Sequence, residues 1–227
     1  MQLTVLGSAN AIPTHRRACS GYLLEWAGGA CLLDASAGTY MRALRAGLDR
    51  KRLRVVALSH FHLDHAADLP AILWARRQED DWPRPLVLAG PEGTAGHVAS
   101  LRAAYGDWLE TPLEVRGYPF EDAGLLIEAF PARHSDEAVC LRVTAGGRAL
   151  AYSGDSADCD GLRAACHDAD LALLECSSMD AKEGHMRPED CAAVVEAARP
   201  RRVLLTHLGS DVRSDLPTAE DGMVVSV

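Results

Sequence analysis

The sequence predicts an α/β fold, in which strands come first and strands then alternate with helices. Two observations support this class. Short apolar runs with turn residues between them fill the first third of the chain, and helix-length amphipathic segments appear between later apolar runs. No linker is long enough to divide the 227 residues, so we expect one domain over residues 1–227.

The first third of the chain is predicted to hold four strands and one helix. The strands are expected at Gln2–Leu6, Tyr22–Trp26, Cys31–Asp34 and Arg54–Leu58. The turn at residues 27–29 joins the second strand to the third. A helix over Tyr40–Ala46 ends at Gly47, a residue type that commonly stops helices.

The rest of the chain continues the alternation. Helices over residues 69–78 and 93–105 flank a strand at Leu86–Ala89, and the segment 80–85, which holds two prolines, breaks the first helix. Further strands are expected at Glu114–Tyr118, Leu125–Ala129, Cys140–Thr144, Leu150–Ser153, Leu171–Glu175 and Arg202–Thr206. Glycines at 146 and 147 predict a hairpin, and Pro188 fits the first turn of a helix over residues 187–200.

Charge and cysteine content restrict the partners and the compartment. The formal net charge is −9, and two divalent cations, which add +4, would still leave −5, so the overall field repels a long phosphate backbone. The seven cysteines form no CxxC pair, and the start MQLTVLGSANAIP lacks a signal-peptide pattern. We expect reduced thiols in the cytoplasm. No apolar run approaches the ~20 residues of a membrane span, so we expect no membrane partner.

Titratable residues gather in LSHFHLDH, residues 58–65, at the end of an apolar run. His60 and His62 are two positions apart and can point the same way in a turn, while Asp64 and His65 can face a neighbouring position. Imidazole and carboxylate together suit zinc, iron or manganese rather than calcium. One loop can therefore offer ligands to two metals.

Two metals need further ligands, and the chain places candidates after later strand-like runs. These are His134 in PARHSD, Asp155 in YSGDS and His207 in LLTHLGS. Segments 54–60 and 202–207 also share one pattern, in which a basic residue, an apolar strand and a small hydroxyl residue precede a histidine. Such an echo arises by chance in some α/β chains, but it also fits a duplicated half-domain.

These motifs together resemble the metallo-β-lactamase superfamily, with SHFHLDH as its HxHxDH motif, and within it the RNase Z-like branch. The likeness covers nearly the whole chain, through LGSANAIPT, LLDASAGT around Asp34, PARHS, YSGDS, GHMRPEDCA and LLTHLGS. It implies a four-layer αββα sandwich made of two pseudo-equivalent halves.

The resemblance also implies a ligand set and its cofactors. One metal would be held by His60, His62 and His134, the other by Asp64, His65 and His207, with Asp155 bridging the two. Asp34 would orient a ligand by accepting its free ring N–H. We expect two divalent cations, with Zn²⁺ first and Mn²⁺ or Fe²⁺ compatible with the same ligands. Asp64 and Asp34 are counted with His185 as the expected catalytic residues.

This ligand set predicts hydrolysis. Two cations roughly 3.5–4 Å apart can share a water, lower its pKa to about 7 and stabilise charge on the attacking and leaving oxygens. The sequence has no GxSxG nucleophile elbow, which favours a metal-bridged hydroxide as nucleophile. For His185, in EGHMRPED, the resemblance implies a general acid that protonates the leaving oxygen or contacts the phosphate. A surface histidine near a helix start is the other interpretation of His185.

The substrate expectation comes from a missing segment. By the resemblance, RNase Z proper carries a long arm between its His motif and its bridging aspartate and grips tRNA with it, whereas here Asp155 follows His134 by only 21 positions. The sequence therefore favours a phosphodiesterase for small or cyclic phosphodiesters over one for long nucleic acid. A lactonase or thioesterase on the same metals, an RNA 3′-end processing nuclease, and a non-enzymatic metal-bearing sensor stay open as alternatives. A homodimer is compatible with the sequence.

Overall fold

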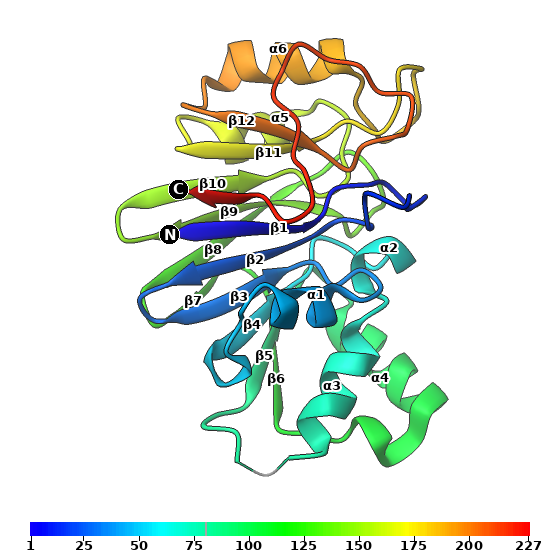
Figure 1. The fold of residues 1–227 in the computed structure, drawn as a ribbon, viewed down its shortest axis with the longest axis vertical. Coiled ribbons are helices and arrows are strands. Elements are labelled where there is room, and N and C mark those ends of the chain that lie inside the picture. Colours follow the sequence, from blue (N-terminus) through cyan, green and yellow to red (C-terminus); the bar gives the residue numbers. More distant parts are fainter. Residues whose placement is uncertain (80) are drawn as a thin grey trace.

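Two β-sheets form the centre of the structure, a computed structural model that describes residues 1–79 and 81–227 (Figure 1). The seven-stranded sheet has the order β13-β1-β2-β3-β4-β5-β6. Its strands are β1 (Gln2–Gly7), β2 (Gly21–Trp26), β3 (Gly29–Leu33), β4 (Leu53–Ala57), β5 (Leu86–Ala89), β6 (Leu113–Arg116) and β13 (Val224–Ser226).

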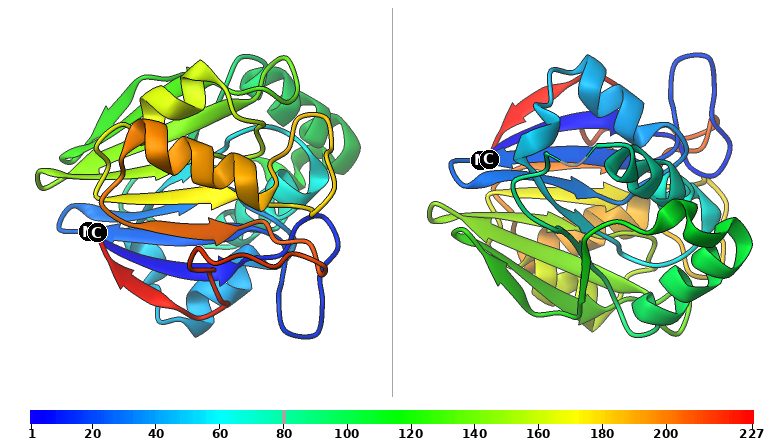
Figure 2. Two further views of the ribbon diagram at one scale, coloured as in Figure 1. Left: turned by 90° about the horizontal axis from the view of Figure 1, so that it is seen from above. Right: turned by 90° about the horizontal axis from the view of Figure 1, so that it is seen from below.

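The six-stranded sheet has the order β12-β11-β10-β9-β8-β7. Its strands are β7 (Phe120–Asp122), β8 (Leu125–Pro131), β9 (Val139–Ala145), β10 (Arg148–Tyr152), β11 (Leu171–Glu175) and β12 (Val203–Thr206). The chain ends lie side by side, because β13 pairs with β1 and the Val227 N–H donates to the Met1 carbonyl at 3.0 Å (Figure 2).

Helices cover the outer faces of both sheets, α1, α3 and α4 on one side and α5 and α6 on the other (Figure 1). The α-helices are α1 (Thr39–Arg45), α2 (Leu63–Ala66), α3 (Leu69–Arg77), α4 (Thr94–Tyr105), α5 (Asp160–Cys166) and α6 (Pro188–Ala198). Two 3₁₀ turns, η1 (Arg50–Arg52) and η2 (Gly106–Leu109), precede β4 and follow α4. The four-layer αββα arrangement that the sequence predicted is confirmed.

The strands are apolar on both faces because each sheet is covered on both sides. In β4, Val55 packs between the sheets, whereas the next residue, Val56, packs under the helices of the outer layer. In β2, Leu24 likewise packs between the sheets, and Leu23 packs under the helices of the outer layer. Successive side chains of a strand point to opposite faces, so burial on both sides produces continuous apolar runs rather than alternation.

Strand direction determines where the functional side chains emerge. Strands β3 to β6 run parallel to one another, and β10 to β12 also run parallel. In open α/β sheets the loops at the carboxyl ends of parallel strands meet at one edge, where ligands bind. Loops after β4, β10 and β12 carry four of the residues singled out in the sequence, which are His60, His62, Asp155 and His207.

Most sequence-predicted elements are present, with boundary shifts of at most two residues. Asp34 does not continue β3, because its φ of 56° lies in the left-handed region. The sequence analysis missed α2, α5, β7 and β13, which have between three and seven residues each. Position 80, the first residue of the predicted break at 80–85, lies outside the described residues. The single-domain expectation stays a prediction.

Candidate metal centre

The structure brings all seven sequence-predicted ligands to one edge of the sandwich. Loops after β4, β8, β10 and β12 supply five of them, and the short helix α2 supplies Asp64 and His65. Their donor atoms form two groups that share Asp155, and within each group all donor atoms lie within 4.8 Å of one another. Residues 147 positions apart in the sequence, from His60 to His207, therefore converge.

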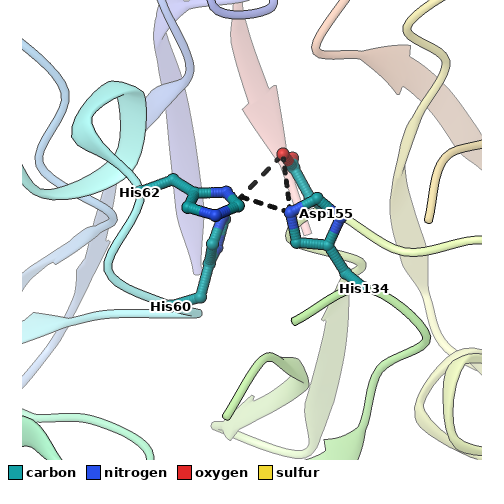
Figure 3. Close-up of side chains that lie close together, drawn as sticks. All are labelled: His60, His62, His134 and Asp155. Atoms are coloured by element: carbon teal, nitrogen blue, oxygen red, sulfur yellow. Dashed lines mark hydrogen bonds and ion pairs between the residues drawn. The ribbon is translucent and has the colours of Figure 1, made fainter. Parts of the chain in front are cut away.

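The first group consists of His60, His62, His134 and Asp155, whose side chains point toward a common centre (Figure 3). His62 Nδ1 lies 3.0 Å from His134 Nε2. The Oδ2 atom of Asp155 lies 3.8 Å from His60 Nε2 and 3.9 Å from His134 Nε2. Three imidazole nitrogens and one carboxylate oxygen thus surround one small volume.

The second group consists of Asp64, His65, Asp155 and His207. Here the other carboxylate oxygen of Asp155, Oδ1, lies 3.1 Å from His65 Nε2 and 3.4 Å from His207 Nε2. Asp64 Oδ2 lies 3.6 Å from His65 Nε2 and 3.9 Å from His207 Nε2. Asp155 therefore presents one oxygen to each group.

Hydrogen bonds to Nδ1 orient the rings of four of the histidines. In each of these rings Nδ1 contacts a group outside the cluster: Ser59 Oγ for His60 at 3.0 Å, Asp34 Oδ2 for His65 at 2.7 Å, the Gly184 carbonyl for His134 at 3.2 Å, and Ser20 Oγ for His207 at 3.1 Å. A carbonyl or carboxylate partner requires the proton on Nδ1, which leaves Nε2 with a free lone pair toward the cluster.

Asp34 is fully buried and accepts four hydrogen bonds. Its donors are the Ser59 N–H at 2.7 Å, the Ser59 hydroxyl at 2.8 Å, His65 Nδ1 at 2.7 Å and the Tyr152 hydroxyl at 2.6 Å. Burial raises the pKa of this carboxyl, but the charge and hydrogen bond of His65 and the other contacts hold it below its usual range. Asp34 therefore stays ionised and touches a candidate ligand from behind.

The polar atoms of the cluster fit a divalent cation. Among the described residues, His60 Nε2, His65 Nε2 and Asp155 Oδ1 are buried without a hydrogen-bond partner, a situation that costs about 1–3 kcal/mol per group. Burial lowers the pKa of His60 to about 3 and that of His207 to about 4. Both rings are therefore neutral at pH 7, which is the form that binds metals. Nitrogen and carboxylate donors of this kind form a divalent-metal site.

A buried carboxylate that the sequence analysis missed lies beside the cluster. Glu175, the last residue of β11, is fully buried and contacts His185 Nδ1 through Oε1 at 2.8 Å. Burial raises the pKa of Glu175 to about 7, and the hydrogen bond to Glu175 raises the pKa of His185. The His185 ring lies 4.9 Å from that of His134 and 6.1 Å from that of His207, between centroids. His185 is thus not an isolated surface histidine.

Comparison with known proteins agrees with this architecture. Residues 30–208 match the sequence profile of the beta-lactamase superfamily domain. The chain belongs to the metallo-β-lactamase superfamily. Within the superfamily it lies in the RNase Z-like branch, as the sequence motifs predicted, and it is a metal-dependent hydrolase by family.

Three relatives illustrate this membership. Ribonuclease Z of Streptomyces coelicolor is 27% identical over 259 aligned positions, which cover 91% of this chain and 86% of that protein. The human tRNase Z, short form, superposes with a TM-score of 0.85 at 25% identity, over 100% of this chain and 99% of the other. A diphosphatase of the PhnP family superposes with a TM-score of 0.77 at 17% identity, over 100% and 97% of the two chains.

Two further expectations can be compared with the structure. All seven cysteines are free thiols, five of them buried. No helix in the described part of the chain has the length and apolar character needed to cross a membrane. The cytoplasmic location and the oligomeric state stay predictions.

Proposed function

We propose that this metallo-β-lactamase-fold hydrolase is a phosphodiesterase that acts on small or cyclic phosphodiesters and holds two divalent cations, zinc before manganese or iron. The observation that carries the proposal is the Glu175–His185 pair, which lies directly beside the ligand cluster. An alkoxide is a poor leaving group, and a positioned acid is what its departure requires.

The two halves of the cluster would each hold one cation. His60, His62 and His134 with Asp155 Oδ2 form one donor set, and Asp64, His65 and His207 with Asp155 Oδ1 form the other. When bound, the cations would supply Lewis-acid stabilisation of charge on the phosphoryl oxygens and would activate water for attack. Asp34 would keep His65 in the tautomer that points Nε2 at the second set.

His185 would deliver the proton to the leaving oxygen. Because Nδ1 is engaged by Glu175, Nε2 is the nitrogen left to donate. The buried carboxylate raises the pKa of His185, so the ring carries a proton over more of the neutral range. After transfer, Glu175 would hold the neutral ring in the same orientation until it is protonated again by solvent.

Three observations support a small substrate. Only the β9–β10 hairpin fills the interval between His134 and Asp155. The alignment with the Streptomyces ribonuclease Z extends over 259 positions, more than the 227 residues of this chain, so that relative has inserted residues that this chain lacks. The net charge of −9 adds repulsion toward long nucleic acid.

The proposal is tested with bis(p-nitrophenyl) phosphate and a cyclic nucleotide. We expect hydrolysis that a chelator abolishes and that zinc or manganese restores. Asp155→Ala should remove activity, whereas Asp158→Ala, which changes a carboxylate paired with Arg163, should not. Full activity in Asp155→Ala would refute the mechanism.

His185 separates phosphodiester cleavage from acyl hydrolysis on the same metals. His185→Ala should reduce kcat on an unactivated phosphodiester by about 10²–10⁴-fold and affect hydrolysis of a lactone or thioester far less. His167→Ala is the matched control, because that histidine is exposed, contacts Asp168 and is not among the candidate ligands. Equal losses on both substrates would contradict the assignment of His185 as leaving-group acid.

RNA 3′-end processing is the second candidate, because one relative is a ribonuclease Z and a neighbour in structure is a tRNase Z. A pre-tRNA with a 3′ extension tests it directly. Cleavage of that RNA with a kcat/KM above that for cyclic nucleotides would establish the second candidate in place of the first.

A further inference from the structure

A cavity of about 580 Å³ opens on the same edge of the sandwich as the metal cluster. The loops after β5 and β6 form one wall through Gly90, Gly93 and Gly117, and the paired ends of β8 and β9 form the other through Pro131 and Val139. This volume is typical of small-molecule sites, which span about 300–1,000 Å³. None of the residues that line the cavity has a role in the reaction proposed above.

The cavity adjoins the loops that carry the first ligand group. Strand β4 leads to His60 and its parallel neighbour β5 leads to the cavity wall, so the two positions differ by one strand spacing, about 4.8 Å. The Val139 N–H donates to the Ser59 carbonyl at 3.0 Å. The Phe61 ring would lie 3.3 Å from a Cβ placed on Gly93. A ligand held at the cluster by its phosphate can therefore reach the cavity within about one to two strand spacings, roughly 5–10 Å.

The walls of the cavity suit an uncharged ring that carries N–H donors. Proline, alanine and valine side chains and glycine backbone make up most of the lining, and the charged side chains among the lining residues are Glu92, Asp136 and Glu137. No lysine or arginine of the described chain lines it. Carboxylates accept hydrogen bonds from amino groups and repel a phosphate, so the phosphoryl group belongs at the metals and the organic part belongs here.

We propose that this cavity holds the nucleobase of a nucleoside cyclic phosphate whose phosphoryl group lies at the metal cluster. The inference rests on the proposed phosphodiesterase function and narrows its substrate class. We expect a base with an exocyclic amino group, as in adenine, guanine and cytosine, because carboxylates accept hydrogen bonds from such groups. Further phosphates of an oligonucleotide would meet the same carboxylates and be repelled.

Gly117→Leu tests the cavity by filling it. Gly117 lines the cavity, and no heavy atom lies within 4 Å of a Cβ placed on it, so a side chain can be added at this wall without a clash at Cβ. Gly96→Leu is the matched control, because a Cβ there also meets open space, on α4 and outside the cavity. We expect Gly117→Leu to raise KM for 3′,5′-cyclic adenosine monophosphate about tenfold with little change in kcat, since the base contributes binding alone.

The base-free ester methyl p-nitrophenyl phosphate is the reference substrate. Its kcat/KM should stay within about twofold in Gly117→Leu, because no base has to enter the cavity. The Kd of a hydrolysis-resistant cyclic adenosine phosphorothioate should rise about tenfold in the same variant, and the zinc content should equal that of the wild type.

The double variant Asp136→Asn/Glu137→Gln tests the amino-group requirement. The wild type should prefer the adenosine cyclic phosphate to the inosine one, which lacks the amino group, by about tenfold in kcat/KM. The double variant should bring that ratio close to one. Asp160→Asn, an exposed carboxylate outside the cavity, should keep it.

The outcomes separate this inference from the proposed function. A zinc-loaded wild type that hydrolyses no phosphodiester refutes the function itself. Hydrolysis with no dependence on the base, or with equal losses on both substrates in Gly117→Leu, overturns the base cavity and leaves the function standing. If Gly117→Leu fails to fold by circular dichroism, the adenosine-to-inosine ratio in the double variant decides.

Discussion

Replacing Asp34 by asparagine should damage both stability and metal affinity through one hydrogen-bond network. Asparagine has the shape of aspartate and tolerates the left-handed backbone that Asp34 adopts at φ 56°, so the backbone is not strained by the change. The amide, however, replaces one acceptor oxygen with an NH₂ group. Oδ1 accepts one hydrogen bond and Oδ2 accepts three, so the NH₂ group meets a donor at either position.

The magnitude follows from where the NH₂ group can lie. At the position of Oδ1 it faces the Ser59 backbone N–H, which cannot reverse. At the position of Oδ2 it faces two hydroxyls, which can rotate, and His65 Nδ1, which must shed its proton and place it on Nε2. One unsatisfied buried group costs about 1–3 kcal/mol, and a lost hydrogen bond to a charged group costs about 1.5–3 kcal/mol. We expect about 3–5 kcal/mol of lost stability.

The affinity for metal should also fall in Asp34→Asn, because a proton on His65 Nε2 occupies the lone pair that would bind the cation. Loss of a partner behind a ligand typically lowers affinity about 10–100-fold. Urea unfolding in EDTA measures the free energy of unfolding without any contribution from bound metal. Zinc titration at pH 7 measures the metal affinity. Asp68→Asn is the control: this carboxylate accepts from the Gly38 and Tyr40 N–H groups and touches no candidate ligand.

The effect of pH on this variant has a definite sign. The pKa of Asp34 is lower in the folded protein than in the unfolded chain, so its contribution is fully present above the unfolded pKa and is lost as the pH falls through the folded value. The stability difference between wild type and Asp34→Asn should therefore shrink in acid. Wild-type zinc affinity in Asp34→Asn, with Asp68→Asn equally destabilised, would refute the reasoning.

Three further changes have definite expected outcomes. Gly161→Ala should lower the free energy of unfolding by about 1–3 kcal/mol in urea melts, because the new Cβ would lie 2.0 Å from a backbone carbonyl oxygen at the end of β8. Arg54→Met should cost about 1 kcal/mol in the same assay, because the two-point ion pair with Asp122 stays partly exposed to solvent, which screens its charges. Glu175→Gln should move the alkaline limb of the kcat–pH profile to lower pH, because the bond to Glu175 raises the pKa of His185 and the ring must be protonated to act.

The sequence predicted the buried strands well because burial on both faces leaves a strong apolar signal. Strands β5 and β11 have the predicted boundaries, and Pro188 lies in the first turn of α6 as expected. Short elements lack that signal. Strand β7 has three residues and is recognisable as a strand because it pairs with β8, and β13 is a strand because it pairs with β1. Pairing partners far apart in the sequence determine such elements, and local pattern does not reveal them.

The ligand candidates were predictable because histidine and aspartate rarely end buried strands. The orientation of their side chains was not predictable from the sequence. The ring of His134 is aimed by the Gly184 carbonyl, and that of His207 by Ser20, which is 187 positions away. A backbone carbonyl and a common small hydroxyl leave no mark in sequence that distinguishes them from ordinary turn residues. These contacts can be read only from the folded chain.

The position of Glu175 shows why topology was needed to find it. The residue ends an apolar strand, LALLE, and in sequence a carboxylate there is indistinguishable from the polar boundary of a strand. Strand β11 lies between β10 and β12, and Glu175 pairs with Thr206, the residue before His207. Neighbouring strands are about 4.8 Å apart, so this order places the carboxylate between the strand ends that carry Asp155 and His207. Sequence adjacency does not determine the order of parallel strands, because each crossover helix could return the chain on either side. Only the observed order makes Glu175 part of the candidate site.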